Sequence, residues 1–181
     1  MSSHRVEKVI NHLFQPVGDQ SPPQVHAILD AASSDVIYRK VLKASVPSVC
    51  LFRGEKARKL AWVAPYLLEL LREDPFTEWL LENGWGKSWG IFLESPAPFR
   101  QLREHFRSFL TVYDEEGKPL LFRYYDPRVF RVYLPTCNQS ELEIVFGPVK
   151  RFCVEAEEDN GIIDYSLTSG KLSEYVTPLE T

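Results

Sequence analysis

The hydrophobic pattern of the first half of the chain alternates between helical and extended segments. Apolar residues from Val6 to Phe14 recur at intervals of three or four, which predicts an amphipathic helix over residues 4–14. Residues 66–71 form a short apolar run that fits a third strand, although periodicity alone also permits a helix. The other predicted elements are a strand over 25–30, a helix over 34–44, a buried strand over 48–52, a helix over 55–62, a helix from Pro75 to Gly84 and a strand over 89–95.

The second half contains one clear helix and two hairpins. Residues 97–110 place phenylalanines and a leucine at helical spacing, so we expect a helix there. Asn160-Gly161 between two apolar runs predicts a tight hairpin. The pattern of residues 139–146 fits no single element. The remaining predictions are a hairpin of strands 111–114 and 119–125, a helix from Asp126 to about Leu134, strands over 152–157 and 162–167, and a loose segment over the last eleven residues.

Strands alternating with helices, followed by hairpins, predict an α/β (α+β) fold. We expect a single compact domain with a mixed β-sheet flanked by helices, because 181 residues can enclose one substantial core. The expected divisions are an N-terminal helix and linker (1–23), the main domain (24–170) and a loose C-terminal tail (171–181). The side chains expected in the core are Trp79, Trp89, Phe106 and Phe109.

Composition and charge exclude several classes of protein. The chain is 44% hydrophobic and 25% charged, which is ordinary for a globular domain. Its net charge of −4 lacks the basic surplus of nucleic-acid-binding proteins, so no nucleic-acid partner is expected. Residues 138–181 carry nine acidic and three basic residues, which fits a solvated hairpin and tail.

The cysteines and the hydropathy pattern indicate a cytoplasmic protein. Cys50, Cys137 and Cys153 are odd in number and lack metal-binding spacing, which fits free thiols in a reducing compartment. Cys50 lies in an apolar run and is expected to be buried. We expect no signal peptide, because the N-terminus lacks a basic segment followed by a long apolar stretch. We expect no membrane insertion, because no window approaches 18 uninterrupted apolar residues.

Signatures of catalysis, cofactors and metals are missing from the sequence. The four histidines are scattered, and no Cys-x₂-Cys, Gly-x-Ser-x-Gly or Gly-x-Gly-x-x-Gly pattern occurs in a suitable context. We therefore expect no enzyme activity, and name no catalytic, cofactor-binding or metal-binding residue.

A binding surface is the better hypothesis, and residues 123–131 are the first candidate. Arg123 and Tyr125 are expected on one face of a strand, and arginine and tyrosine are common at interaction hot spots. Asp126 before a proline fits a helix N-cap. Arg128 then either pairs with Asp126 or points outward to a partner, and Arg131 follows one helical turn later.

Two further patterns have both a structural and a functional interpretation. Arg100, Arg103 and Arg107 form a stripe along the predicted helix, which is either a solvated face or a second partner-binding surface. Gly84-Trp85-Gly86 and Trp89-Gly90 fit tight turns with tryptophans in the core, or alternatively an aromatic binding platform.

These motifs, in their order and spacing, resemble one family: the domain of unknown function carried by adaptor chaperones of the bacterial type VI secretion system. The similarity extends over roughly residues 24–155. Its fragments are Ala27-Ile28-Leu29-Asp30-Ala31-Ala32, Leu51-Phe52 with Gly54, Ala64-Pro65-Tyr66-Leu67, Trp85-Gly86, Trp89-Gly90-Ile91, Leu102/His105/Phe106, Phe122-Arg123-Tyr124-Tyr125-Asp126-Pro127-Arg128, Leu134-Pro135 and Phe146-Gly147-Pro148.

The resemblance implies a non-enzymatic cytoplasmic chaperone with two protein partners, a secreted effector and the spike protein that carries it. It also implies a minimal, single-lobe version of the family, and it assigns no catalytic or binding residue. The alternative is a small hydrolase or transferase with an unrecognised site, which a deep polar pocket would favour and a shallow apolar groove would not.

Overall fold

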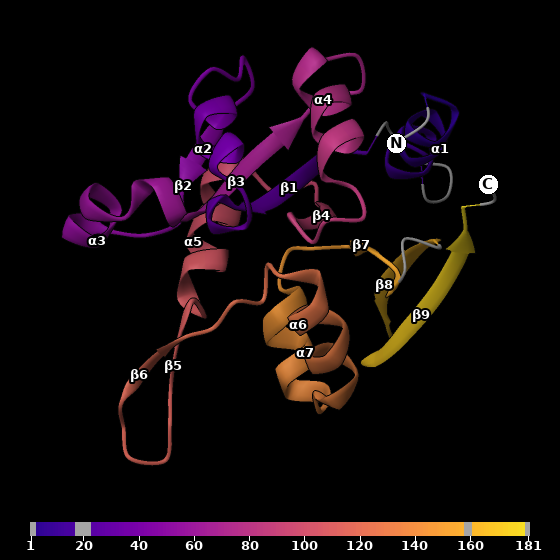
Figure 1. Cartoon of the computed structure of the whole chain (residues 1–181). Coiled ribbons are helices and arrows are strands. Elements are labelled where there is room, and N and C mark those ends of the chain that lie inside the picture. The colour runs from indigo at the N-terminus through magenta and orange to yellow at the C-terminus, as the bar shows by residue number, and fades with distance from the viewer. Residues whose placement is uncertain (1–2, 17–22, 158–160, 180–181) are drawn as a thin grey trace.

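The computed structural model describes residues 3–16, 23–157 and 161–179. Within them, seven strands form one sheet in the order β2-β3-β1-β4-β7-β8-β9, and β5 pairs with β6 in a separate hairpin (Figure 1). The strands are β1 (Val25–Asp30), β2 (Ser48–Cys50), β3 (Pro65–Leu70), β4 (Gly90–Glu94), β5 (Thr111–Tyr113), β6 (Pro119–Leu121), β7 (Arg151–Glu155), β8 (Gly161–Thr168) and β9 (Lys171–Pro178).

Helices cover both faces of this sheet, so all six residues of the interior strand β1 are buried. The helices are α1 (Ser3–Leu13), α2 (Asp35–Val41), α3 (Gly54–Lys59), α4 (Pro75–Gly84), α5 (Phe99–Ser108), α6 (Pro127–Tyr133) and α7 (Gln139–Phe146). In Figure 1, α1, α2 and α4 lie above the sheet, and α5, α6 and α7 lie below it. The predicted α+β domain is confirmed, and its strand pairings among the described residues are all antiparallel.

An aromatic cluster joins the lower helices to the sheet. Phe152 of β7 contacts Phe106 of α5, Phe130 of α6 and Phe146 of α7, with ring centroids 4.9–6.4 Å apart. Phe106 is fully buried and Trp89 is almost fully buried, as predicted. The other two predicted core residues, Trp79 and Phe109, are only partly buried and pack against the core from its edge.

Helix caps account for several element boundaries. Asp74 accepts a hydrogen bond from the amide of Phe76 and Pro75 occupies the first turn of α4, as the sequence predicts. The ambiguous segment 139–146 is helix α7, and Asn138 and Glu141 form a capping box at its start. In the second ambiguous segment, 66–71, residues 66–70 lie in strand β3, which ends at Leu70.

Three expectations are wrong. Residues 122–125 are not part of a strand, because β6 ends at Leu121 and the chain turns there toward α6. The C-terminal segment is not loose, because residues 171–178 form β9, which pairs with β8 along its whole length. The predicted buried strand 48–52 is a strand only over Ser48–Cys50, a partly exposed edge strand in which Cys50 is half-buried, whereas Leu51 and Phe52 are buried but follow the strand. The Asn160 of the predicted turn lies outside the described residues.

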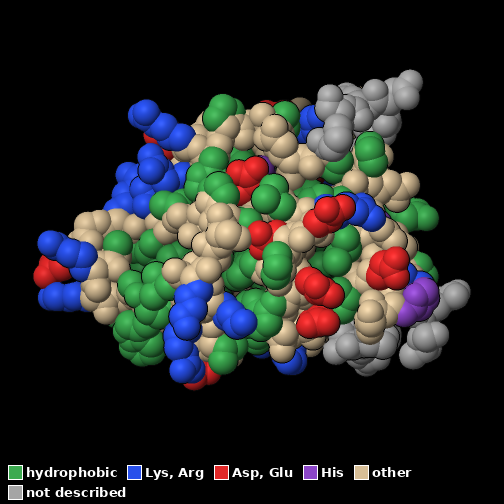
Figure 2. Space-filling model, turned by 90° about the horizontal axis from the view of Figure 1, so that it is seen from above, with side chains coloured by type: hydrophobic (Ala, Val, Ile, Leu, Met, Phe, Trp, Pro, Cys, Tyr) green, Lys and Arg blue, Asp and Glu red, His purple; other side chains and the backbone are tan. Residues whose placement is uncertain are grey.

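Charge is distributed unevenly over the surface. Residues 35–59, which include α2 and α3, carry seven basic and two acidic side chains, a net charge of +5 in a chain of net charge −4. Figure 2 shows the molecule from above. Lys and Arg side chains are concentrated toward its left end, where α3 lies in Figure 1, and Asp and Glu side chains lie mostly nearer the centre and right. One end of the domain is therefore basic. None of the described helices combines the length and apolar character needed to cross a membrane.

Candidate functional site

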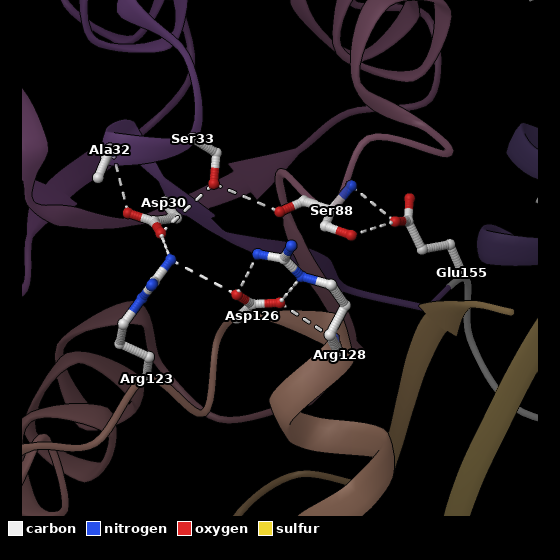
Figure 3. Close-up of polar contacts among 8 residues, drawn as sticks. All are labelled: Asp30, Ala32, Ser33, Ser88, Arg123, Asp126, Arg128 and Glu155. Atoms are coloured by element: carbon white, nitrogen blue, oxygen red, sulfur yellow. Dashed lines mark hydrogen bonds and ion pairs between the residues drawn. The ribbon is translucent and has the colours of Figure 1, made fainter. Parts of the chain in front are cut away.

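Three carboxylates and one serine, from four separate parts of the chain, meet at one end of the central strands (Figure 3). Asp30 is the last residue of β1, Ser88 lies just before β4, Asp126 precedes α6, and Glu155 ends β7. Antiparallel β1 and β4 bring the first two together, and the amide of Asp30 donates to the carbonyl of Trp89 at 2.8 Å. The three carboxylates are all buried, so their charges need partners inside the fold.

Arg123 bridges two of these carboxylates. Its Nη2 atom lies 2.6 Å from Oδ2 of Asp30 and 3.4 Å from Oδ2 of Asp126. Asp30 also accepts hydrogen bonds from the amide of Ala32 at 3.0 Å and the hydroxyl of Ser33 at 3.4 Å. Burial opposes the charge of Arg123, but the Asp30 hydrogen bond and the two carboxylates outweigh it and raise the pKa of Arg123.

Arg128 holds the other side of Asp126. Its Nε and Nη2 atoms donate to the two carboxylate oxygens at 3.0 and 2.8 Å, a bidentate pair, and its amide donates to Oδ1 at 3.0 Å. Burial of Asp126 opposes ionisation, but these hydrogen bonds dominate and lower the pKa of its carboxyl group. Of the two alternatives for Arg128, the structure shows the pair with Asp126, which also caps α6.

Glu155 anchors the loop between α4 and β4. Its carboxylate accepts from the amides of Gly86 and Ser88, each at 2.6 Å, and from the Ser88 hydroxyl at 3.1 Å. Burial nevertheless raises the pKa of Glu155. Arg131 donates to the backbone carbonyl of Glu155 at 2.6 Å, which ties α6 to the end of β7.

The first predicted binding surface is thus largely a brace within the fold. Arg123, Arg128 and Arg131 all make intramolecular bonds, although the side chain of Arg128 also remains well exposed to solvent. Tyr125, expected beside Arg123 on an exposed face, is buried, and burial raises the pKa of its hydroxyl group. The reason is the turn after Leu121, which places Tyr124 and Tyr125 together in the core.

The predicted arginine stripe divides into three different environments. Arg100 is exposed and pairs with Glu104 one turn along α5. Arg103 is half-buried, with its Nη2 atom 3.8 Å from Glu104. Arg107 donates to the carbonyls of Cys50, Leu51 and Phe52, so it fastens α5 to the end of β2. The stripe is neither wholly solvated nor wholly a free surface.

Sequence reasoning missed Asp30, Ser88 and Glu155 as members of this cluster. Asp30 left a usable signal, since a charged residue that ends an otherwise apolar strand is expected to need a partner. Glu155 and Ser88 left none, because their contact depends on the pairing of β4 with β7 and on the loop that precedes β4.

A second polar group lies between α1 and the sheet. His12 Nε2 is 2.6 Å from Asp164 Oδ2, and the Cys153 thiol donates to Asp164 Oδ1 at 2.8 Å. His12, Cys153 and Asp164 each offer one possible ligand atom, and these three atoms lie close enough together to hold a metal ion. Arg151 Nη1 lies 3.6 Å from the same Asp164 oxygen, however, and burial raises the pKa of the Cys153 thiol. The positive charge of Arg151 and the protonated Cys153 thiol both disfavour metal binding here.

The comparisons with known proteins define the family but not the activity. The sequence model of the family described as Domain of unknown function (DUF4123) matches residues 25–143. The chain belongs to this family. The DUF4123 match includes Asp30, Ser88, Arg123, Asp126 and Arg128, and it ends before Glu155. No curated protein and no solved structure matches the chain.

Proposed function

We propose that the protein is a non-enzymatic adaptor chaperone, which binds an effector of a type VI secretion system and helps to load it onto the secretion spike. The support from sequence is its membership of the DUF4123 family, together with the resemblance of its motifs to the adaptors. The observation that carries the proposal is the β5–β6 hairpin, which projects from the domain as an apolar arm (Figure 1).

All six strand residues of this arm are exposed. Four of them are large and apolar: Val112, Tyr113, Leu120 and Leu121. Val112 and Leu120 pair directly and share one face of the arm, whereas Tyr113 and Leu121 lie on the other, so both faces are apolar. We call these four side chains, taken over both faces, the hairpin patch. A two-stranded hairpin buries little surface by itself, so an exposed apolar one fits a contact with another protein.

The arm is held in shape by its own turn. The Asp114 carboxylate accepts from the amides of Glu116 and Lys118 at 3.1 and 2.8 Å, and Gly117 adopts a positive φ of 78°. At the base, the amide of Phe122 donates to the carbonyl of Leu110 at 2.9 Å. A partner would therefore meet a preorganised arm, which lowers the entropic cost of binding.

The alternative, a small hydrolase or transferase, has one supporting observation. A polar cavity of about 280 Å³ is lined by Glu94, Lys150, Arg151 and Asp164, among others. Within it, Nη atoms of Arg151 lie 3.3 Å from Glu94 and 3.6 Å from Asp164, and His12 also bonds Asp164, so both carboxylates already have partners within the fold. A catalytic acid or base is instead expected to be free to exchange a proton with a substrate.

The proposal is tested by measuring the affinity of the chain for the effector encoded beside its gene. The double variant Tyr113→Ser/Leu120→Ser removes apolar area from the hairpin patch, and we expect it to weaken binding by on the order of 2–4 kcal/mol. This double variant should melt like the wild type, because the Tyr113 and Leu120 side chains are 70% and 44% exposed.

The matched control is Tyr175→Ser/Val176→Ser on β9, where the same classes of side chain are 69% and 49% exposed. It should leave the affinity unchanged. Equal losses in the two double variants, or no loss in either, would show that the hairpin patch does not bind the effector. Failure of the wild-type chain to bind any effector or spike protein would contradict the proposed function itself.

A further inference from the structure

The groove between α2 and the start of α4 combines an aromatic floor with a basic rim. It is a cavity of about 390 Å³. Phe76 and Trp79 of α4 form the floor, and their ring centroids lie 5.7 Å apart. Arg39, Lys40 and Lys43 line the side contributed by α2 and the turn after it. We call this the α2–α4 groove.

The basic side chains of the groove are only partly neutralised from within. Arg39 pairs with Asp35 on the same helix, at 2.5 Å. Lys40 places its Nζ atom 4.8 Å from the centroid of the Trp79 ring, an arrangement that keeps the ammonium charge directly above the floor. Lys43 is exposed and has no ion-pair partner among the described residues.

Asp74, the carboxylate that lines the groove, already accepts hydrogen bonds from within the fold. Oδ1 of Asp74 accepts from the amide of Phe76 and Oδ2 accepts from the Ser45 hydroxyl, both at 2.8 Å. Its charge therefore caps α4, and three basic side chains, Arg39, Lys40 and Lys43, face this one carboxylate in the lining of the groove. An occupant of this groove meets an apolar floor within a positive field, so acidic and apolar groups complement it together.

We infer that the α2–α4 groove docks an acidic protein segment that lays an apolar side chain against Phe76 and Trp79, beside the rim lysines. The inserted side chain would cover Phe76 and Trp79, and flanking carboxylates would approach Lys40 and Lys43. The groove is separate in sequence from the hairpin patch. The inference adds a second contact to the proposed adaptor, but its test does not depend on the identity of the effector.

The test uses a fluorescein-labelled synthetic peptide with a central Phe-Leu pair flanked on both sides by Glu and Asp. Binding to the full chain is measured by fluorescence anisotropy at moderate salt. The charge reversal Lys40→Glu/Lys43→Glu should weaken binding at least about tenfold. Replacing the central Phe-Leu pair by Ala-Ala should weaken it to a similar degree, because the aromatic floor then loses its partner.

The matched control is Arg58→Glu/Lys59→Glu, an equal change of charge on the exposed surface of α3. It should change the affinity by less than about twofold if the contact is local. Hydrogen exchange with the peptide bound should show protection of residues 36–45 and 74–79.

Three results would overturn the inference. Equal losses in the two charge-reversal variants would indicate general attraction to the basic end of the domain. Protection elsewhere in the chain would place the peptide at another site. A single-stranded DNA oligonucleotide that displaces the peptide at equal charge would indicate a site for polyanions rather than for an acidic apolar segment.

Discussion

Replacing Arg123 by alanine separates its role as a brace from a role in contacting a partner. The substitution leaves Asp30, whose side chain is 2% exposed, without its cationic partner, while Asp126 keeps Arg128. Breaking a fully buried ion pair costs about 3–5 kcal/mol. Because the Arg123 side chain is 43% exposed, water partly replaces it, and we expect a loss of about 1.5–3 kcal/mol.

The assay is urea or thermal unfolding of the wild type and of Arg123→Ala, with Arg100→Ala as the control. For a chain of this length each kcal/mol lowers the melting temperature by about 2–4 °C. Arg100 makes an exposed pair within α5, so its removal should produce no measurable shift. Asp30→Asn/Arg123→Ala should lose less stability than the two single variants together. An unchanged melting temperature for Arg123→Ala would refute the claim that Arg123 stabilises the fold. If that variant also lost effector binding, the result would support a direct contact with the partner instead.

The remaining predictions concern the core and pH. Phe106→Ala should lower the free energy of unfolding by roughly 3–5 kcal/mol, since this ring is fully buried among aromatic neighbours, and a loss under 1 kcal/mol in denaturant unfolding would contradict that packing. Burial lowers the pKa of His26 to about 4 from about 6.5, so below pH 6.5 the unfolded chain binds a proton that the folded chain does not. The contribution of His26 to the free energy of unfolding should therefore be complete above pH 6.5 and fall by about 2–3 kcal/mol toward pH 4. A His26→Leu variant measured over the same range should lack this pH-dependent loss.

Local signals in the sequence predicted the elements whose boundaries depend on neighbouring residues. Pro75 after Asp74, and Pro127 after Asp126, mark the starts of α4 and α6 because each pair combines a capping carboxylate with a residue that lacks an amide hydrogen. The periodicity of Phe99–Phe106 similarly identified α5. Such elements need no knowledge of the tertiary fold.

The errors arise where tertiary pairing decides. Residues 171–178 are mostly exposed and polar, and they are a strand because β8 offers them a free edge. The alternation after Leu121 predicts a continuing strand, but the chain turns there and buries both Tyr124 and Tyr125. The candidate site was found in part, since Arg123 and Arg128 were singled out. Their partner Asp30 lies 93 residues away from Arg123 in sequence, a distance at which local patterns carry no information.

The sharpest test of the proposed adaptor role is deletion of the gene for this chain in its source organism. The amount of the neighbouring effector in the culture medium is compared with that of a second substrate of the same secretion machine. If the chain is the adaptor, secretion of the effector is lost and secretion of the second substrate continues. The wild-type gene then restores secretion of the effector, whereas the Tyr113→Ser/Leu120→Ser variant does not. Undiminished secretion of the effector in the deletion strain would contradict the account.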